Sequence, residues 1–79
     1  MPEIGKITHY FDKIGVAVID LKKELKVGDK IQFKGPNTDF TQAVDSMQID
    51  KKPIPKASRG LIALKVTQKV SAGDLVMKP

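Results

Sequence analysis

The sequence contains no cysteine, and it contains one histidine, His9, among its 79 residues. The missing thiols exclude disulfides, thiolate zinc sites, iron–sulfur clusters and cysteine nucleophiles. With a single histidine, no site can use two histidine ligands, and a Ser-His-Asp triad would have to include His9. The sequence therefore predicts no cofactor and no metal.

Long apolar runs and targeting signals are also missing. No segment reaches the ~18 apolar residues of a membrane span. The longest apolar stretch, residues 14–19, is interrupted by Gly15, and Met1-Pro2-Glu3 lacks the basic start and apolar centre of a signal peptide. We therefore expect a cytoplasmic protein with no membrane partner.

The motifs of the common enzyme classes are missing as well. No Gly-x-x-x-x-Gly-Lys-Ser/Thr loop is present, so we expect neither binding nor hydrolysis of GTP or another nucleotide. Asp45 with Asp50, or Asp12 with Asp39, would be the candidates for an acid/base pair, but nothing in the sequence fixes their separation. The interpretation is a protein that is not an enzyme.

Positive charge is present and unevenly placed. The net charge is +5, and residues 41–79 hold six lysines and Arg59 against three acids. A basic face raises the local concentration of polyanions, which predicts RNA or the ribosome as a partner. The alternative is that these side chains only solubilise the domain and protect sheet edges. The candidate RNA-binding residues are Lys51, Lys52, Lys56, Arg59, Lys65 and Lys69.

Turn residues recur every eight to twelve positions, which is typical of an all-β sandwich or barrel. We expect one domain over residues 1–79, a closed antiparallel barrel of six to seven strands. A short amphipathic window, Asp20 to Val27, predicts at most one helical turn because Gly28 ends it. The candidate strands are Ile4 to Tyr10, Ile14 to Asp20, Lys30 to Lys34, Phe40 to Ile49, Gly60 to Val66 and Asp74 to Met77.

Two breaks in the alternation predict β-bulges. Ile4 and Ile7 are out of phase, with Gly5 between them, and Val44 and Met47 are out of phase around Asp45-Ser46. The fifth strand predicts a buried face, Ile62, Leu64 and Val66, and a second, partly covered face that begins at Leu61 and Ala63. The expected core is Ile7, Val16, Val18, Ile31, Phe33, Val44, Met47, Ile49, Ile62, Leu64 and Val76.

The few aromatic residues divide between two uses. Phe11, Phe33 and Phe40 are expected in the core, and Met47 and Met77 are expected to fill it. Alternatively, Tyr10 and Phe11 form a stacking platform for bases, with Lys13 adding a phosphate contact. His9 is expected to be a surface or half-buried packing residue.

The run Leu25-Lys26-Val27-Gly28-Asp29-Lys30-Ile31 resembles a signature of the second domain of translational GTPases, the β-barrel that follows the nucleotide-binding domain of elongation factor Tu. Further stretches resemble that domain in the same order. They are Gly5-Lys6-Ile7, Ile14 to Val18, Thr41 to Met47, Ala57 to Leu64, and Gly73 to Val76.

This resemblance implies a small, free-standing translation-factor-like protein that binds RNA or the translation machinery without catalysis. The basic residue of the elongation factor's aminoacyl pocket would be Lys51, but Asp50 stands where the family has an aromatic residue. The same barrel is reused elsewhere, for example as the C-terminal barrel of collagenase-like peptidases. The alternative function is therefore a protein–protein docking barrel, accessory to an enzyme encoded elsewhere.

Overall fold

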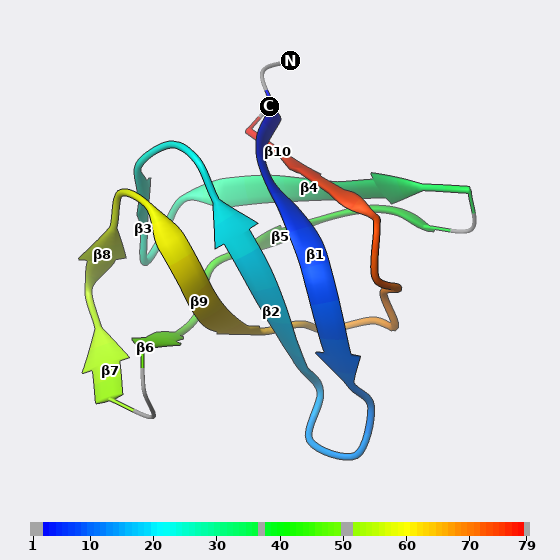
Figure 1. The fold of residues 1–79 in the computed structure, drawn as a ribbon, viewed down its shortest axis with the longest axis horizontal. Coiled ribbons are helices and arrows are strands. Elements are labelled where there is room, and N and C mark those ends of the chain that lie inside the picture. Colours follow the sequence, from blue (N-terminus) through cyan, green and yellow to red (C-terminus); the bar gives the residue numbers. More distant parts are fainter. Residues whose placement is uncertain (1–2, 37, 50–51, 79) are drawn as a thin grey trace.

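The computed structural model describes residues 3–36, 38–49 and 52–78, and within them it contains strands and turns but no helix (Figure 1). The absence of a helix agrees with the expectation for the window Asp20 to Val27. The strands are β1 (Glu3–Phe11), β2 (Val16–Leu21), β3 (Leu25–Lys26), β4 (Lys30–Gly35), β5 (Thr38–Ala43), β6 (Met47–Ile49), β7 (Lys52–Ile54), β8 (Lys56–Ala57), β9 (Gly60–Lys65) and β10 (Leu75–Met77).

Eight strands form one antiparallel sheet, in the order β5-β4-β10-β1-β2-β9-β6-β7, and β3 pairs with β8 in a separate small sheet. The all-β, antiparallel prediction is confirmed. The predicted closed barrel is not found, because no ladder joins the edge strands β5 and β7 among the described residues. The strand count also differs, because the predicted strand Phe40 to Ile49 divides into two, and three short strands were not expected.

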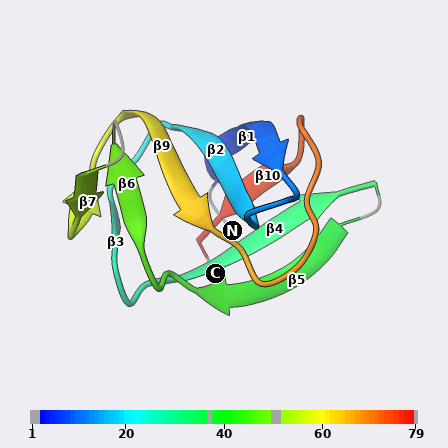
Figure 2. The ribbon, with the colours of Figure 1, turned by 90° about the horizontal axis from the view of Figure 1, so that it is seen from below.

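The long sheet bends across itself and encloses the core. Figure 1 shows β4 and β5 running across β1, β2 and β9, and Figure 2 shows the two groups of strands on opposite sides of the interior. Burying apolar surface between two strand layers is what stabilises a domain of this size. The fully buried side chains include Ile4, Ile7, Ile19, Leu21, Leu25, Ile31, Phe33, Val44, Met47, Ile62, Leu64 and Val70.

A side-chain amide links β5 to the end of β9 and to the chain that follows it. The buried Gln42 donates from Nε2 to the Lys65 carbonyl at 3.1 Å, and its Oε1 accepts from the Thr67 amide at 2.9 Å. A carboxamide has the donor and acceptor of a peptide group, and these two backbone groups lie two residues apart, as on one side of a strand. Among the described residues, β5 has no neighbouring strand on this side in the sheet order, and the Gln42 side chain makes two hydrogen bonds to the adjacent main chain instead.

Strand β1 contains two bulges, of which the sequence indicated one. The register with β10 shifts between Glu3 and Gly5, so that Ile4 and Ile7 both face inward, as predicted. Gly5 is required there, because an added Cβ would lie 2.9 Å from Cγ2 of Ile19. The register with β2 shifts again between Ile7 and His9. The second shift was not predicted.

That second bulge explains why Phe11 is 45% exposed instead of lying in the core. A one-residue shift reverses the face of every later side chain on the strand. Tyr10 consequently packs against the core, and Phe11 points away from it. The other two phenylalanines confirm the prediction, since Phe33 is buried and the half-buried Phe40 stacks on it with ring centroids 5.0 Å apart.

The inward face of β2 was also predicted wrongly. Ala17, Ile19 and Leu21 face the core, whereas Val16 and Val18 lie half-buried on the opposite face. Both faces of this strand are apolar, so the alternation that fixes the register of a strand is missing from the sequence.

The segment between β5 and β6 corrects two further expectations. Val44 and Met47 are both buried, as predicted, but the chain leaves β5 at Ala43 and pairs again only in β6. Ile49 was expected in the core and is 38% exposed, because it ends β6 opposite Lys52 of β7. Met77, expected as core filler, is half-buried.

Candidate interaction surface

The outward face of three neighbouring strands carries an apolar strip. We define the outer strip as Phe11, Val16, Val18, Leu61 and Ala63, from β1, β2 and β9. Phe11 lies opposite Val16, and Val18 lies opposite Ala63, so these residues share one face. Leu61 is 61% exposed, while its neighbour Ile62, on the inward face, is 1% exposed.

Polar side chains border this strip. Lys65 lies opposite Val16, Gln48 lies opposite Ala63, and Asp20 lies between Lys6 and Leu61 in the register of three strands. All four polar side chains are exposed. An apolar centre with a polar rim of both charges is the usual anatomy of a protein–protein contact.

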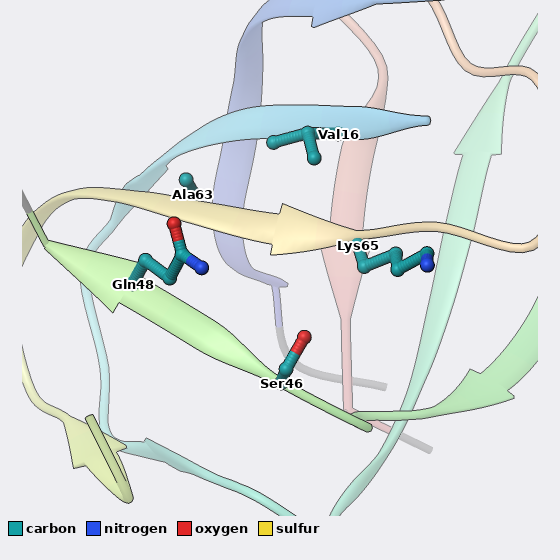
Figure 3. A pocket seen from close by; sticks show the side chains of 5 residues that line it. All are labelled: Val16, Ser46, Gln48, Ala63 and Lys65. Carbon is teal, nitrogen blue, oxygen red and sulfur yellow. The ribbon is translucent and has the colours of Figure 1, made fainter. Parts of the chain in front are cut away.

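A small hollow of about 80 Å³ opens in this face, lined by Val16, Ser46, Gln48, Ala63 and Lys65. Figure 3 shows Val16 and Ala63 beside each other, with the amine of Lys65 pointing away from Ser46 and Gln48. Binding pockets for drug-sized molecules are ~300 Å³ or more. The hollow therefore suits the end of one inserted side chain rather than a small-molecule substrate.

The turn between β1 and β2 extends the exposed apolar surface. Ile14 is 65% exposed, and the rings of His9 and Phe11 lie with their centroids 5.0 Å apart. A second hollow, of about 330 Å³, is lined only by the consecutive residues 10–14. It is the inside of one turn, so it does not bring separate elements together as a binding pocket does. His9 is exposed, as the surface prediction for it allows.

Where the structure describes the predicted RNA-binding residues, it places them on several different elements. Lys52, Lys56, Arg59, Lys65 and Lys69 are all exposed, and Lys51 lies outside the described residues. Arg59 precedes β9 and Lys65 ends it. At about 3.3 Å per strand residue, these two positions are roughly 20 Å apart along the sheet.

The acidic residues that the structure describes are not gathered into a site. Among the described residues, no group of three or more His, Asp and Glu side chains is placed to hold a metal ion. Asp12, Asp39 and Asp45 are exposed on different turns and strands, and Asp50 lies outside the described residues, so neither candidate acid/base pair is supported. Over the same part of the chain, no helix could span a membrane.

The match to protein-family models identifies the domain. Residues 3–76 match the peptidase family U32 C-terminal domain. The chain belongs to this family of U32 C-terminal domains. Its sequence is 37% identical over 76 residues to an uncharacterized protease of Methanocaldococcus jannaschii. The match covers 94% of this chain and 19% of that protease, so the chain spans about a fifth of the relative's length.

Solved structures show the same fold. The C-terminal domain of a Geobacillus thermoleovorans chain assigned to the U32 peptidases superposes with a TM-score of 0.92 over 99% of this chain and 100% of that one, at 20% identity. A second crystal structure of that domain gives a TM-score of 0.91 over 98% of this chain and 91% of that one, also at 20% identity. Both are C-terminal domains of the family to which this chain belongs.

These matches correct the assignment to the elongation factor Tu second domain, and with it the translation-factor and RNA-binding interpretation. The Val27-Gly28-Asp29 motif explains the error. Gly28 has a φ of +97°, and an Asp29 carboxylate oxygen accepts from the Lys26 amide at 3.0 Å. These residues form a tight turn before a strand, and a turn of this kind specifies local geometry rather than a family.

The outer strip was only partly visible in the sequence. The second face of β9 was expected to be partly covered, but Phe11, Val16 and Val18 were assigned to the core. The unbroken apolar stretch 16–19 was the available signal, because a strand that is apolar on both parities has two faces to cover.

Proposed function

We propose that this domain is a non-catalytic accessory module that docks onto the remainder of a U32 peptidase-family protein. The family match carries the proposal: a domain named for the C-terminal part of a peptidase family makes up about a fifth of a longer protease. The exposed outer strip supports docking, because burial of such side chains against a partner is favourable.

The proposal includes the barrel that the sequence predicted. Gln42 bonds β5 to the end of β9 and the chain that follows it, and the main chain from Val44 to Met47 connects β5 with the β6 end of the sheet. We propose that these links hold the sheet as one barrel-like body, which presents a fixed surface to its partner.

Calorimetry of a chimera tests the docking. This chain replaces the 76 matching residues of the M. jannaschii protease, and the unfolding midpoint of the domain is compared in the chimera and in isolation. Docking links unfolding to loss of the contact, so the midpoint should rise in the chimera. An unchanged midpoint in the chimera would mean that the domain is only tethered.

The non-catalytic part has its own test. The isolated chain should cleave no peptide bond in a mixed-peptide digest read by mass spectrometry. Cleavage that follows the chain through successive purification steps would overturn this part of the proposal and leave the docking untouched.

A further inference from the structure

The outer strip is not used by the domain's own fold. The core side chains of β2 and β9 lie on the other face, where Ile19 is opposite Ile62 and Ala17 is opposite Leu64. Among the described residues, Val16, Val18 and Ala63 are half-buried and lie outside the buried core cluster. The strip is thus a sheet face that lacks a partner.

The strip can form the centre of an interface but not the whole of it. From the level of Val16 to that of Leu61, which lies opposite Asp20, the strip runs about 13 Å, and three strands span roughly 10 Å. A stable interface covers about 800 Å² on each partner, several times this area. The polar rim around the strip, with Lys6, Asp20 and Lys65, would supply the rest of the contact. This arrangement suits a folded protein surface with an apolar centre and mixed charges at its edge.

The position of the chain ends indicates which protein surface lies there. Glu3 of β1 pairs with Met77 of β10, so both ends of the described chain meet at one edge of the fold, opposite the β1–β2 turn (Figure 1). Lys6, three residues or about 10 Å along β1 from Glu3, lies in register with Asp20 and Leu61. A preceding domain that enters at Glu3 therefore reaches the Leu61 end of the strip first.

The M. jannaschii relative is long enough to contain such a preceding domain. About four-fifths of the M. jannaschii protease lies outside the matched region, and the family name places the matched domain at the C-terminal end. A tether of this kind raises the effective concentration of the two surfaces to the millimolar range. A modest apolar contact is then sufficient to keep them together.

We infer that the outer strip is the docking surface of this domain, and that its occupant is the part of a U32 peptidase-family protein that precedes the matched domain in the longer relative. The inference rests on the docking proposed above and names the surface responsible. Leu61 and Phe11 are its main contacts, because they are the most exposed large side chains of the strip, and the hollow beside Val16 and Ala63 receives one side chain of the occupant.

Cysteine labelling in the chimera tests this assignment, because the chain has no cysteine of its own. Leu61→Cys and Val18→Cys probe the outer strip. Thr41→Cys on β5 and Ser58→Cys before β9 are control positions that are exposed and lie outside the strip. Maleimide labelling of each site is measured by mass spectrometry in the isolated chain and in the chimera.

We expect labelling at positions 61 and 18 to slow at least tenfold in the chimera, and labelling at positions 41 and 58 to change less than twofold. Protection of a control position, with none in the strip, would overturn the outer strip as the docking surface while leaving docking intact. No protection at any of the four positions would overturn both the assignment and the proposed docking.

Discussion

The two faces of β9 carry similar side chains in opposite environments. Ile62 and Leu64 are 1% and 0% exposed, whereas Leu61, one position away, is 61% exposed. Leucine and isoleucine gain a similar free energy from burial, so composition alone cannot account for the difference. The inward face therefore holds this fold together, and the outward face is available for contact with another protein surface.

The largest difference in the free energy of unfolding is expected between substitutions at two neighbouring positions of β9. Ile62→Ala should destabilise the domain by about 3 kcal/mol, since it removes buried methyl groups and leaves a cavity. Leu61→Ala should change the free energy of unfolding by less than about 0.5 kcal/mol. Urea unfolding followed by circular dichroism gives both values, and equal losses would remove the distinction between the two faces.

A glycine on β4 tests how closely the interior is packed. A Cβ added to Gly35 would lie 2.6 Å from Cγ of Asp74, a buried residue whose carboxylate accepts from the Ser71 amide at 2.9 Å. Gly35→Ala should therefore cost about 2 to 3 kcal/mol, through overpacking and a weakened hydrogen bond.

The control is a double-mutant cycle with Asp74→Ala, which removes the obstructing carboxylate. The double variant should be less destabilised than the sum of the two single variants. Strict additivity in chemical unfolding would show that Gly35 and Asp74 do not interact in this way.

The Gln42 bridge should contribute less, because it is one polar side chain. Gln42→Ala removes the partners of the Lys65 carbonyl and the Thr67 amide, at a cost of about 1 to 2 kcal/mol. Gln32→Ala is the matched control, since Gln32 donates to Asp39 at 2.8 Å in an exposed position. If both variants unfold at the same urea concentration, the bridge contributes nothing specific.

The smallest effect is expected at the Asp29 turn. The hydrogen bond from the Lys26 amide, followed by the Lys78 amine at 3.1 Å, lowers the pKa of the Asp29 carboxyl from its ordinary value. Because the folded-state pKa is the lower one, this stabilisation is fully present above the unfolded-state pKa of about 4 and is lost as the pH falls further, through the folded-state pKa.

Asp29→Asn removes the ionisable group and should abolish this part of the pH dependence. The stability difference between the natural chain and the variant should shrink on acidification below about pH 4, as measured by thermal unfolding at several pH values. A difference that stays constant with pH would contradict the role of the charge.

The sequence was sufficient for the fold class and for much of the core, because turn residues and alternation report local geometry. Gly5 between two out-of-phase isoleucines predicted the first bulge correctly. The second bulge, after Ile7, contains no glycine, and the register shift that places Phe11 outward depends on pairing with β2. Tertiary pairing of this kind is not visible in the sequence of one strand.

The same limit applies to the candidate site. The count of charges indicated a basic surface at residues 51–69. In the structure, Arg59 and Lys65 lie at opposite ends of one strand, a separation that the count does not report. The outer strip is assembled from β1, β2 and β9, and its members Phe11 and Ala63 are 52 positions apart along the chain. A surface of that kind appears only when the register between strands is known.

The docking role of the outer strip is tested most directly by introducing a charge into it. Leu61→Asp leaves the inward face unchanged but places a carboxylate opposite Asp20, so the isolated chain should lose no more than about 1 kcal/mol, and its own midpoint is the reference for the chimera. In the chimera, the same substitution should remove the rise in midpoint that docking produces, while Thr41→Asp on β5 should preserve it. If the chimera with Leu61→Asp unfolds at the same temperature as the unsubstituted chimera, the outer strip does not hold the domain to its partner.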